Sequence, residues 1–346
     1  MWKKIILGIL IIMSGVAGFF VARAQVVINS TLNNINRDYD TALKNVDLNG
    51  IKVNSDDDIV NVLIIGNDYR EERFYDADGL TDTMIIATMD KKHKALKMVS
   101  LMRDMAVDIP DHGIQKLNAA YSFGGVELLY RTIAQNFNIE LDGYVEVGFD
   151  AFEKIVNAVG GVEVELTESE VSYLNSTNYI SKKKYRNVKV GKQTLNGNQA
   201  LGYCRIRKGG VTVTGLMNDY GRTWRQRTVV KAVFSKIKSL SMSKWIEIAN
   251  QVLGEYVKTD FSNEEIMKYM KDVIMMGQTT VHQLQIPIEG YYRESKDEYP
   301  CGDCLVLTDG VSSEINRTAN AEALNSFVFK YNGKEPFSYG TFESKE

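Results

Sequence analysis

Continuous apolar runs after residue 58 predict strands that are buried on both faces. The run at 60–65 stands out, and 83–89 and 96–102 predict two further strands joined by a charged turn. Strands are also expected at 144–149, 162–166 and 201–207, and residues 281–287, 304–307 and 319–329 are expected to be closing elements of the same domain.

Helical spacing of apolar residues separates several of these strands. It predicts a helix at 118–137 and another at 151–159, which Asp150 caps and Gly160-Gly161 ends. Further helices are expected from Asp219 onward and at 245–256 and 263–276. Interleaved strands and helices predict an α/β protein, a three-layer α/β/α sandwich around a mixed sheet.

A polar stretch interrupts this alternation at 167–190. It contains three consecutive lysines and few large apolar residues. We expect it to form a surface lid.

An uncharged apolar stretch occupies residues 5–22. At about 18 residues it is just long enough for an N-terminal transmembrane helix. Lys3 and Lys4 before it favour a cytoplasmic N-terminus, with the main body outside the cell. A cleaved signal peptide is the alternative, because Ala22-Arg23-Ala24 resembles a cleavage site. The stretch is longer than a usual signal core, which favours an uncleaved anchor.

The chain therefore divides into five parts. They are a cytoplasmic tail at 1–4, a transmembrane anchor at 5–23, a polar juxtamembrane stalk at 24–58, an extracellular domain at 59–335 and a C-terminal tail at 336–346. The domain is long enough for a substantial core.

Cys301 and Cys304 form a C-G-D-C pair. In an oxidising compartment such a pair can close a small disulfide. Zinc is less favoured, because the chain has no second such pair and only three histidines. The pairing of these thiols stays open.

Five arginines fall between residues 205 and 227, in a chain whose formal net charge is −3. A nucleic-acid surface would be basic overall, so a local cluster points instead to one compact anion. Guanidinium groups match phosphate oxygens bidentately. Arg205 and Arg207 would share one face of the strand expected at 201–207.

The helix that follows would add to this cluster. Arg222, Arg225 and Gln226 have the spacing of one helix side, and Asp219 stands where an N-cap would be. A helix N-terminus also attracts anions. The alternative is a solvated helix with salt bridges, which does not account for Arg205 and Arg207.

Aspartates stand at the ends of three expected strands: Asp68 after the first, Asp82 before the second, and Asp104 with Arg103 after the third. Two carboxylates beside arginines can hold a magnesium ion together with a phosphate. Each aspartate alone is equally well explained as a turn residue, and Asn118 as a helix N-cap. The chain has no nucleophile elbow or phosphate-binding Walker loop, which is compatible with phosphoryl transfer by positioning and charge neutralisation.

The ordered set of motifs resembles the LytR-CpsA-Psr family of bacterial cell-wall glycopolymer ligases. The motifs are Asn61 to Arg70, Thr81-Asp82-Thr83-Met84, Ser100 to Asp104, Lys116 to Tyr121 with Gly124-Gly125, Val159 to Val162, Leu195 to Leu201, Arg205-Ile206-Arg207 and Asp219 to Gln226. They span about 170 residues, and the N-terminal apolar stretch fits as well. The C-terminal hundred residues match only loosely.

The resemblance implies a magnesium-dependent transferase outside the membrane. It would move a glycopolymer such as teichoic acid or capsule from a polyprenyl-pyrophosphate carrier to peptidoglycan, through a phosphodiester. By motif, Asp68 and Asp82 resemble the metal ligands. The residues that resemble the catalytic diphosphate site are Arg103, Arg205, Arg207, Asp219, Arg222 and Gln226, with Arg70, Lys116, Asn118 and Arg225 as substrate-binding positions.

The chain departs from the family pattern in two places. Leu80 replaces a frequent arginine, for which Arg70 and Arg73 are candidate substitutes, and Met102 replaces a frequent proline. Two other functions fit the same residues, a polyprenyl-phosphate lipid-binding protein and a hydrolase of the carrier pyrophosphate. The residues do not identify the polymer or the general base.

Overall fold

The structure is a computed structural model that describes residues 30, 32–33, 36–37, 42–67, 81–241, 244, 247–248, 257–277, 280–334 and 337. The predicted anchor and most of the helix predicted at 245–256 lie outside these residues. Among the residues described, no helix has both the length and the apolar character that a membrane crossing requires.

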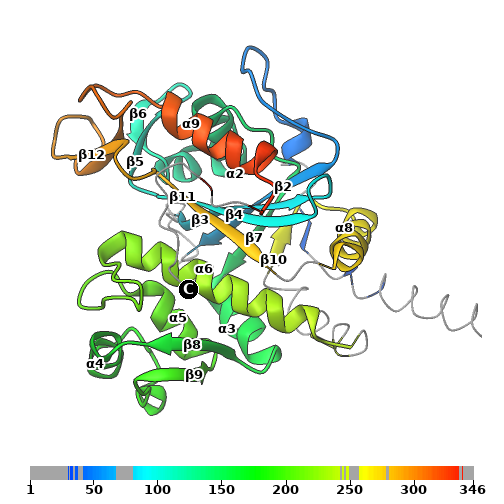
Figure 1. Ribbon diagram of the computed structural model, residues 1–346, viewed down its shortest axis with the longest axis vertical. Helices are drawn as coiled ribbons and strands as arrows, with labels where there is room; N and C mark the ends of the chain where they lie inside the picture. Colours follow the sequence, from blue (N-terminus) through cyan, green and yellow to red (C-terminus); the bar gives the residue numbers. More distant parts are fainter. Residues whose placement is uncertain are drawn as a thin grey trace, which may run out of the picture.

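A mixed seven-stranded sheet forms the centre of the described residues (Figure 1). Its strands, in spatial order, are β1 (Asn36–Arg37), β10 (Val257–Thr259), β7 (Gly143–Gly148), β2 (Ile59–Asn67), β3 (Thr81–Asp90), β4 (Ala95–Leu101) and β11 (Val281–Ile286). β3 runs antiparallel to both its neighbours, whereas β2 pairs with β7 and β4 pairs with β11 in parallel. The mixed α/β fold predicted from the alternating pattern is confirmed.

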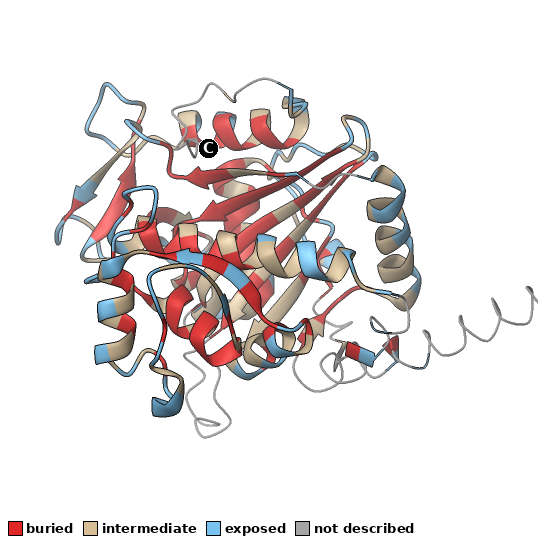
Figure 2. Ribbon diagram, turned by 60° about the horizontal axis from the view of Figure 1, so that its bottom comes forward, coloured by how far each residue is buried: buried red, intermediate tan, exposed pale blue. Residues whose placement is uncertain are grey.

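Helices cover both faces of this sheet (Figure 1). On one face, α2 (Ala119–Phe137) and α9 (Thr318–Asn325) pack on Leu63 and Ile65 of β2. On the other face, α6 (Asn218–Lys238) and α8 (Asn263–Met276) pack on Ile85 of β3. Apolar side chains of these strands therefore point to both faces of the sheet. Figure 2 shows buried positions along the length of the sheet.

Two smaller sheets extend the domain. One contains β12 (Tyr292–Ser295), β13 (Cys304–Leu307), β5 (Met105–Ile109) and β6 (Gly113–Lys116). The other pairs β8 (Val162–Leu166) with β9 (Gly191–Leu195) and has its own core with α3 (Phe149–Ala158), α4 (Glu168–Ser176) and α5 (Gly197–Arg205). The short helices are η1 (Leu43–Asn45), η3 (Lys183–Tyr185) and the π-helical η4 (Ser326–Lys330).

Several local predictions were wrong. Residues 201–207 do not form a strand, because Asn196 and Gln199 form a capping box that starts helix α5. Met217 occupies the N-cap position of α6, and Asp219 is its second residue. Asp150 is likewise the second residue of α3, whose N-cap is Gly148.

The segment predicted as a polar lid is largely ordered against the small sheet. Helix α4 begins at a capping box formed by Thr167 and Glu170. The Asn175 side chain exchanges two hydrogen bonds with the backbone of Val188, at 2.9 and 3.1 Å. These contacts fasten both ends of the segment.

Residues from the predicted stalk and from the predicted C-terminal tail also pack on the main core. Leu43, in the predicted stalk, is buried in the main core, and its amide donates to Asp260 Oδ2 at 2.9 Å. The ring of Phe337, in the predicted C-terminal tail, lies 5.1 Å from the ring of Phe327. Both segments therefore contribute to the domain.

Candidate functional site

Charged side chains gather at one end of the central sheet. Asp82 is the second residue of β3, and Arg103 follows β4 by two residues. The antiparallel register that pairs Met84 with Leu101 places these two residues opposite one another just beyond the ladder. Arg103 Nη1 donates to Asp82 Oδ1. The sheet itself therefore positions the first ion pair of the site.

The start of α6 supplies the second part of the site. Arg222 Nη2 lies 3.1 Å from Asp219 Oδ1, and Arg207 Nε lies 2.8 Å from the same oxygen. Arg222 Nη1 also lies 3.9 Å from Asp82 Oδ1 and so links the helix to the sheet edge. Of the three arginines predicted to converge, Arg207 and Arg222 meet on one oxygen, and Arg205 does not join them there. Arg207 comes from the loop after α5 and not from a strand.

Asp104 links the Lys116 side chain to the cluster. Its carboxylate lies 3.4 Å from Arg103 Nε and 3.8 Å from Lys116 Nζ. The Asn118 amide donates to the Arg103 carbonyl at 3.2 Å, so the start of α2 supports the same loop. Asn118 stands at the N-cap position of α2, but it has helical dihedral angles and its buried side chain makes no capping hydrogen bond. Its side chain therefore does not act as a helix cap, the alternative to its predicted role in substrate binding.

The carboxyl groups of Asp104 and Asp219 have opposite pKa shifts. Burial raises the pKa of Asp104, and its hydrogen bond to Asp219 raises it further. Burial alone would also raise the pKa of Asp219, but Arg222, the hydrogen bond with Asp104 and Arg207 together lower it. The pair thus favours a proton on Asp104 and a charge on Asp219.

The cluster carries excess positive charge. Among the described residues, three guanidinium groups and the Lys116 ammonium face three carboxylates, which leaves one positive charge. Arg222 Nε is buried and has no hydrogen-bond acceptor among the described residues. Buried donors are rarely left without a partner, so this one indicates a place for an acceptor from a ligand. The geometry suits a compact anion such as a phosphate.

Arg205 and Gln226 lie beside the cluster. The Arg205 guanidinium lies over two aromatic rings, with its central carbon 5.1 Å from the Phe149 centroid and 5.6 Å from the Tyr179 centroid. Gln226 is buried on α6, one turn after Arg222. The structure therefore brings Arg207 and Arg222 onto one carboxylate and places Arg205 on an aromatic support.

Arg225, predicted to bind substrate, is fully buried. Its Nε donates to Glu170 Oε1 at 2.7 Å, its Nη1 to the Ile206 carbonyl at 3.1 Å and its Nη2 to the Gly210 carbonyl at 2.9 Å. All three guanidinium nitrogens are thus used inside the protein. This position does not support direct contact with a ligand.

Two predicted site residues lie outside the described residues. They are Asp68, a predicted metal ligand, and Arg70, predicted to bind substrate. Within those that are described, no group of three or more histidine, cysteine or acidic side chains is arranged to hold a metal ion. Asp82, the other predicted metal ligand, lies in the arginine cluster, where it pairs with Arg103.

Sequence reasoning missed two residues of this region. Asp104 was noted only as a charge at a strand end, although it stands next to Arg103 in the same motif. Glu170 gave no signal, because it is one acidic residue in a polar stretch. Its side chain is nevertheless fully buried against Arg225.

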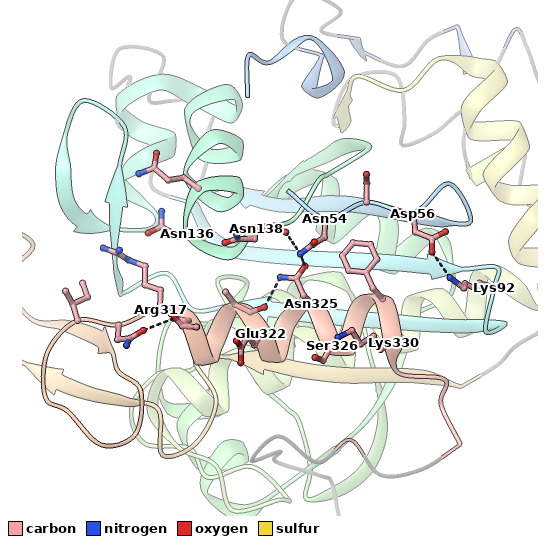
Figure 3. A pocket seen from close by; sticks show the side chains of 17 residues that line it. Asn54, Asp56, Lys92, Asn136, Asn138, Arg317, Glu322, Asn325, Ser326 and Lys330 are labelled. Atoms are coloured by element: carbon pink, nitrogen blue, oxygen red, sulfur yellow. Dashed lines mark hydrogen bonds and ion pairs between the residues drawn. The ribbon is translucent and has the colours of Figure 1, made fainter. Parts of the chain in front are cut away.

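A separate polar groove of about 1010 Å³ lies on the other side of the domain, between α9 and the ends of β2 and α2 (Figure 3). Lys92 lines it, in the turn that follows β3, whereas Asp82 stands at the start of β3. At about 3.3 Å per residue, the two ends of this strand are about 30 Å apart. Asn54 in the groove already bonds Asn138 and Asn325, so its amide is used within the protein. The charged side chains that line the groove are Lys92, Arg317, Lys330, Asp56 and Glu322, and Lys92 lies 2.9 Å from Asp56.

Comparison with known proteins identifies the family of this fold and site. A model of the LytR_cpsA_psr family matches residues 23–303. The chain belongs to the LytR-CpsA-Psr family. The motifs that carried the resemblance lie within the matched range.

Two relatives of this family member show how names differ within the group. The polyisoprenyl-teichoic acid–peptidoglycan teichoic acid transferase TagU of Enterococcus faecalis is 37% identical over 229 residues, which cover 65% of this chain and 69% of TagU. The regulatory protein MsrR of Staphylococcus aureus is 29% identical over 269 residues, which cover 78% of this chain and 74% of MsrR.

A solved structure gives a chemical comparison. It is described as the LytR-CPS2A-psr family protein YwtF (TagT) with bound octaprenyl pyrophosphate lipid. It superposes with a TM-score of 0.56 at 25% identity, covering 80% of this chain and 93% of that one. That relative therefore binds a diphosphate with a prenyl tail.

Proposed function

We propose that this protein is a phosphotransferase that moves a glycopolymer from a polyprenyl-pyrophosphate carrier to peptidoglycan. The observation that carries the proposal is the buried Arg222 guanidinium, which binds Asp219 and approaches Asp82 while its Nε has no acceptor among the described residues. The bound lipid of the TagT structure and the name of the TagU relative support a diphosphate donor and a wall acceptor.

The reaction exchanges one phosphorus–oxygen bond for another. A hydroxyl oxygen of the acceptor, expected to be the 6-hydroxyl of N-acetylmuramic acid, forms a bond to the phosphorus that carries the glycopolymer. The bond from this phosphorus to the bridging oxygen breaks, and polyprenyl phosphate leaves with the electron pair. The hydroxyl proton passes to a base that the residues do not identify.

Arginines contribute by neutralising the charge of the diphosphate. Arg103 enters the candidate site from a sheet edge, Arg207 from a loop and Arg222 from a helix. Ion pairs with Asp82 and Asp219 hold their guanidinium groups in place before the ligand arrives. Fixed charges of this kind stabilise a transition state without reorganisation, which is often the largest contribution to catalysis.

Magnesium fits this site as an ion shared with the substrate. Asp82 offers a carboxylate oxygen, and we propose Asp68 and oxygens of the diphosphate as the other ligands, because magnesium usually combines one or two carboxylates with substrate phosphates. When bound, the ion would withdraw charge from the phosphate oxygens. Replacement of Asp82 by alanine should abolish the difference between transfer measured with magnesium and with a chelator. The fold should be retained.

The proposal also places the domain outside the cell, on a single N-terminal anchor at residues 5–23. The support is the uncharged stretch with lysines before it. Protease added outside intact cells should digest the domain of the full-length chain. Protection of the domain would contradict this location.

The decisive experiment measures transfer by the full-length chain in detergent micelles. The donor is a saccharide linked to polyprenyl pyrophosphate, the acceptor is a muramyl glycan, and mass spectrometry detects the phosphodiester and the released polyprenyl phosphate. Arg222→Met should abolish most of the product. Arg293→Met is the matched control, because Arg293 lies on β12 and its guanidinium bonds the exposed Glu298 and the Ser313 carbonyl instead of the candidate site.

The same experiment tests the two other candidate functions. Donor consumption without phosphodiester would indicate a hydrolase, in which water replaces the sugar hydroxyl. Tight donor binding without any consumption would indicate a lipid-binding protein, an outcome compatible with the name of the MsrR relative, a regulatory protein. Either outcome would contradict the transferase proposal.

A further inference from the structure

The buried Arg225 guanidinium lies between three parts of the chain. Glu170 in α4 accepts from its Nε, and the carbonyls of Ile206 and Gly210 accept from its two terminal nitrogens. The ring of Tyr203 lies below it, 5.8 Å from the guanidinium carbon. Every nitrogen of the group therefore points to a fixed partner.

Two of these partners belong to the loop that carries Arg207. Ile206 directly precedes Arg207, and Gly210 follows it by three residues. Arg225 therefore binds the backbone on both sides of a guanidinium that faces Asp219 in the candidate site. A rotation of this loop would move the Arg207 side chain away from Asp219.

Two glycines let the loop and the helix approach the Arg225 side chain closely. A methyl group at Gly210 would lie 3.2 Å from Arg225 Nη2, and one at Gly221 would lie 3.1 Å from Nη1. Both distances are tighter than ordinary carbon contacts, so a side chain at either position would push on the guanidinium group. The local sequence thus makes room for an arginine in this place.

Glu170 gives the arrangement a rigid base. Its Oε2 accepts from the Thr167 amide at 2.9 Å in the capping box of α4, while its Oε1 accepts from Arg225. Both side chains of this pair are fully buried. A buried ion pair is weak evidence for stability as such, because hydrophobic residues of similar volume often stabilise a fold equally well. The three-way hydrogen bonding of Arg225 is better explained by the Ile206 and Gly210 carbonyl groups that it holds in place.

We propose that Arg225 is a positioning residue that holds the Arg205–Gly210 loop so that Arg207 meets Asp219 and the diphosphate. Arg225 does not contact the ligand and acts through the backbone. The effect on transfer rests on the proposed function, whereas the effect on the loop does not.

The conservative variant Arg225→Lys tests this inference in the full-length chain. Lysine keeps a charge for Glu170, but a single ammonium cannot donate along three fixed directions. Hydrogen exchange of the ligand-free protein should be about tenfold faster at the amides of residues 206–212 and unchanged in α2. The affinity for octaprenyl pyrophosphate should fall about tenfold. Arg293→Lys, the matched exposed control, should change neither quantity.

A second variant separates positioning from folding. In the double variant Glu170→Gln and Arg225→Met, glutamine can keep the capping box of α4, and no charge remains to be buried. We expect it to fold, with the same faster exchange at 206–212 and the same loss of affinity. The double variant therefore tests the inference even if Arg225→Lys alone does not fold.

Several outcomes would overturn the inference. One is exchange at 206–212 that equals the wild-type rate in a folded variant. Another is a faster-exchanging loop whose variant binds octaprenyl pyrophosphate as tightly as wild type does. If the wild-type chain itself bound no octaprenyl pyrophosphate, the proposed function would fail, and the exchange rates alone would still decide whether Arg225 holds the loop.

Discussion

Arg222 and Arg225 lie three residues apart on α6, and both are almost completely buried, yet their surroundings differ. The Arg225 guanidinium has a carboxylate and two carbonyls for its three nitrogens. Arg222 has carboxylates for its terminal nitrogens, but its Nε lacks an acceptor among the described residues. Burial alone therefore does not separate a structural arginine from a ligand-binding one. The two positions differ instead at Nε, which donates to Glu170 in Arg225 and has no acceptor among the described residues in Arg222.

The largest expected effect separates the two arginines by stability. Arg225→Met leaves Glu170 charged, buried and without its partner, which should cost about 3–5 kcal/mol of unfolding free energy. Urea denaturation followed by tryptophan fluorescence measures it. A loss comparable to that of a surface substitution would show that Glu170 finds another partner. It would also contradict the expected difference in stability effect between Arg225 and Arg222.

Arg222→Met should show the reverse pattern. Transfer should fall by roughly 10²–10³-fold, as happens when one preorganised donor is removed from a charged transition state. Burial lowers the pKa of Arg222, so the folded protein already holds this charge at a cost, and its unfolding free energy should fall less than that of Arg225→Met. Transfer at the wild-type rate would exclude Arg222 from the site.

The carboxyl pair offers a finer comparison through pH. The pKa of Asp219 is lowered from 3.8, so its charge stabilises the fold above that value, and the stabilisation is lost as the pH falls through the lower folded pKa. Asp219→Asn should remove this acid-dependent loss and cost about 1–2 kcal/mol at neutral pH, because two guanidinium groups lose their shared partner.

Asp104 should behave in the opposite way. Its pKa is raised above 3.8, so the folded chain holds the proton more tightly, and stability falls as the pH rises from 3.8 through the folded pKa. Asp104→Asn, which resembles the protonated form, should abolish that fall. Thermal unfolding between pH 3 and 7 measures both variants. Identical pH profiles for the asparagine variants would contradict unequal sharing of the proton.

The smallest effect is expected at an ion pair whose lysine is mostly exposed. Lys182 Nζ lies 3.1 Å from Glu153 Oε2, and more than half of the lysine side chain is exposed. Lys182→Ala should change the unfolding free energy by less than about 1 kcal/mol, with transfer unchanged. A larger loss would mean that a short distance between the charged atoms stabilises the fold even when the lysine is exposed.

Much of the fold follows from local pattern, and the site follows only in part. The run at 60–65 predicts a doubly buried strand because its neighbours on both sides must be apolar. The strand expected at 201–207 was wrong, because alternating residues outweighed the capping signal at Asn196 and Gln199, which was present in the sequence. β5 and β6 are short and polar in part, so neither has a distinct pattern.

The separate fates of the arginines on α6 could not be predicted. Arg222 and Arg225 have the spacing of one helix side, and nothing near them in the sequence tells them apart. Their difference depends on Glu170, which lies 55 residues before Arg225 and reaches it only through the packing of α4. Long-range partners of this kind are set by tertiary structure.

Gly66, near the end of β2, illustrates how a position without any ligand contact constrains the site. It pairs with Thr83 in the antiparallel ladder, and a methyl group at Gly66 would lie 2.8 Å from the Thr83 β-carbon. Any side chain there would displace β3 next to Asp82, at the strand end where the first ion pair forms. The range of residues that this position tolerates is thus set by the neighbouring strand, and inactive variants in a random mutant library are expected at codon 66 as well as at the arginine codons.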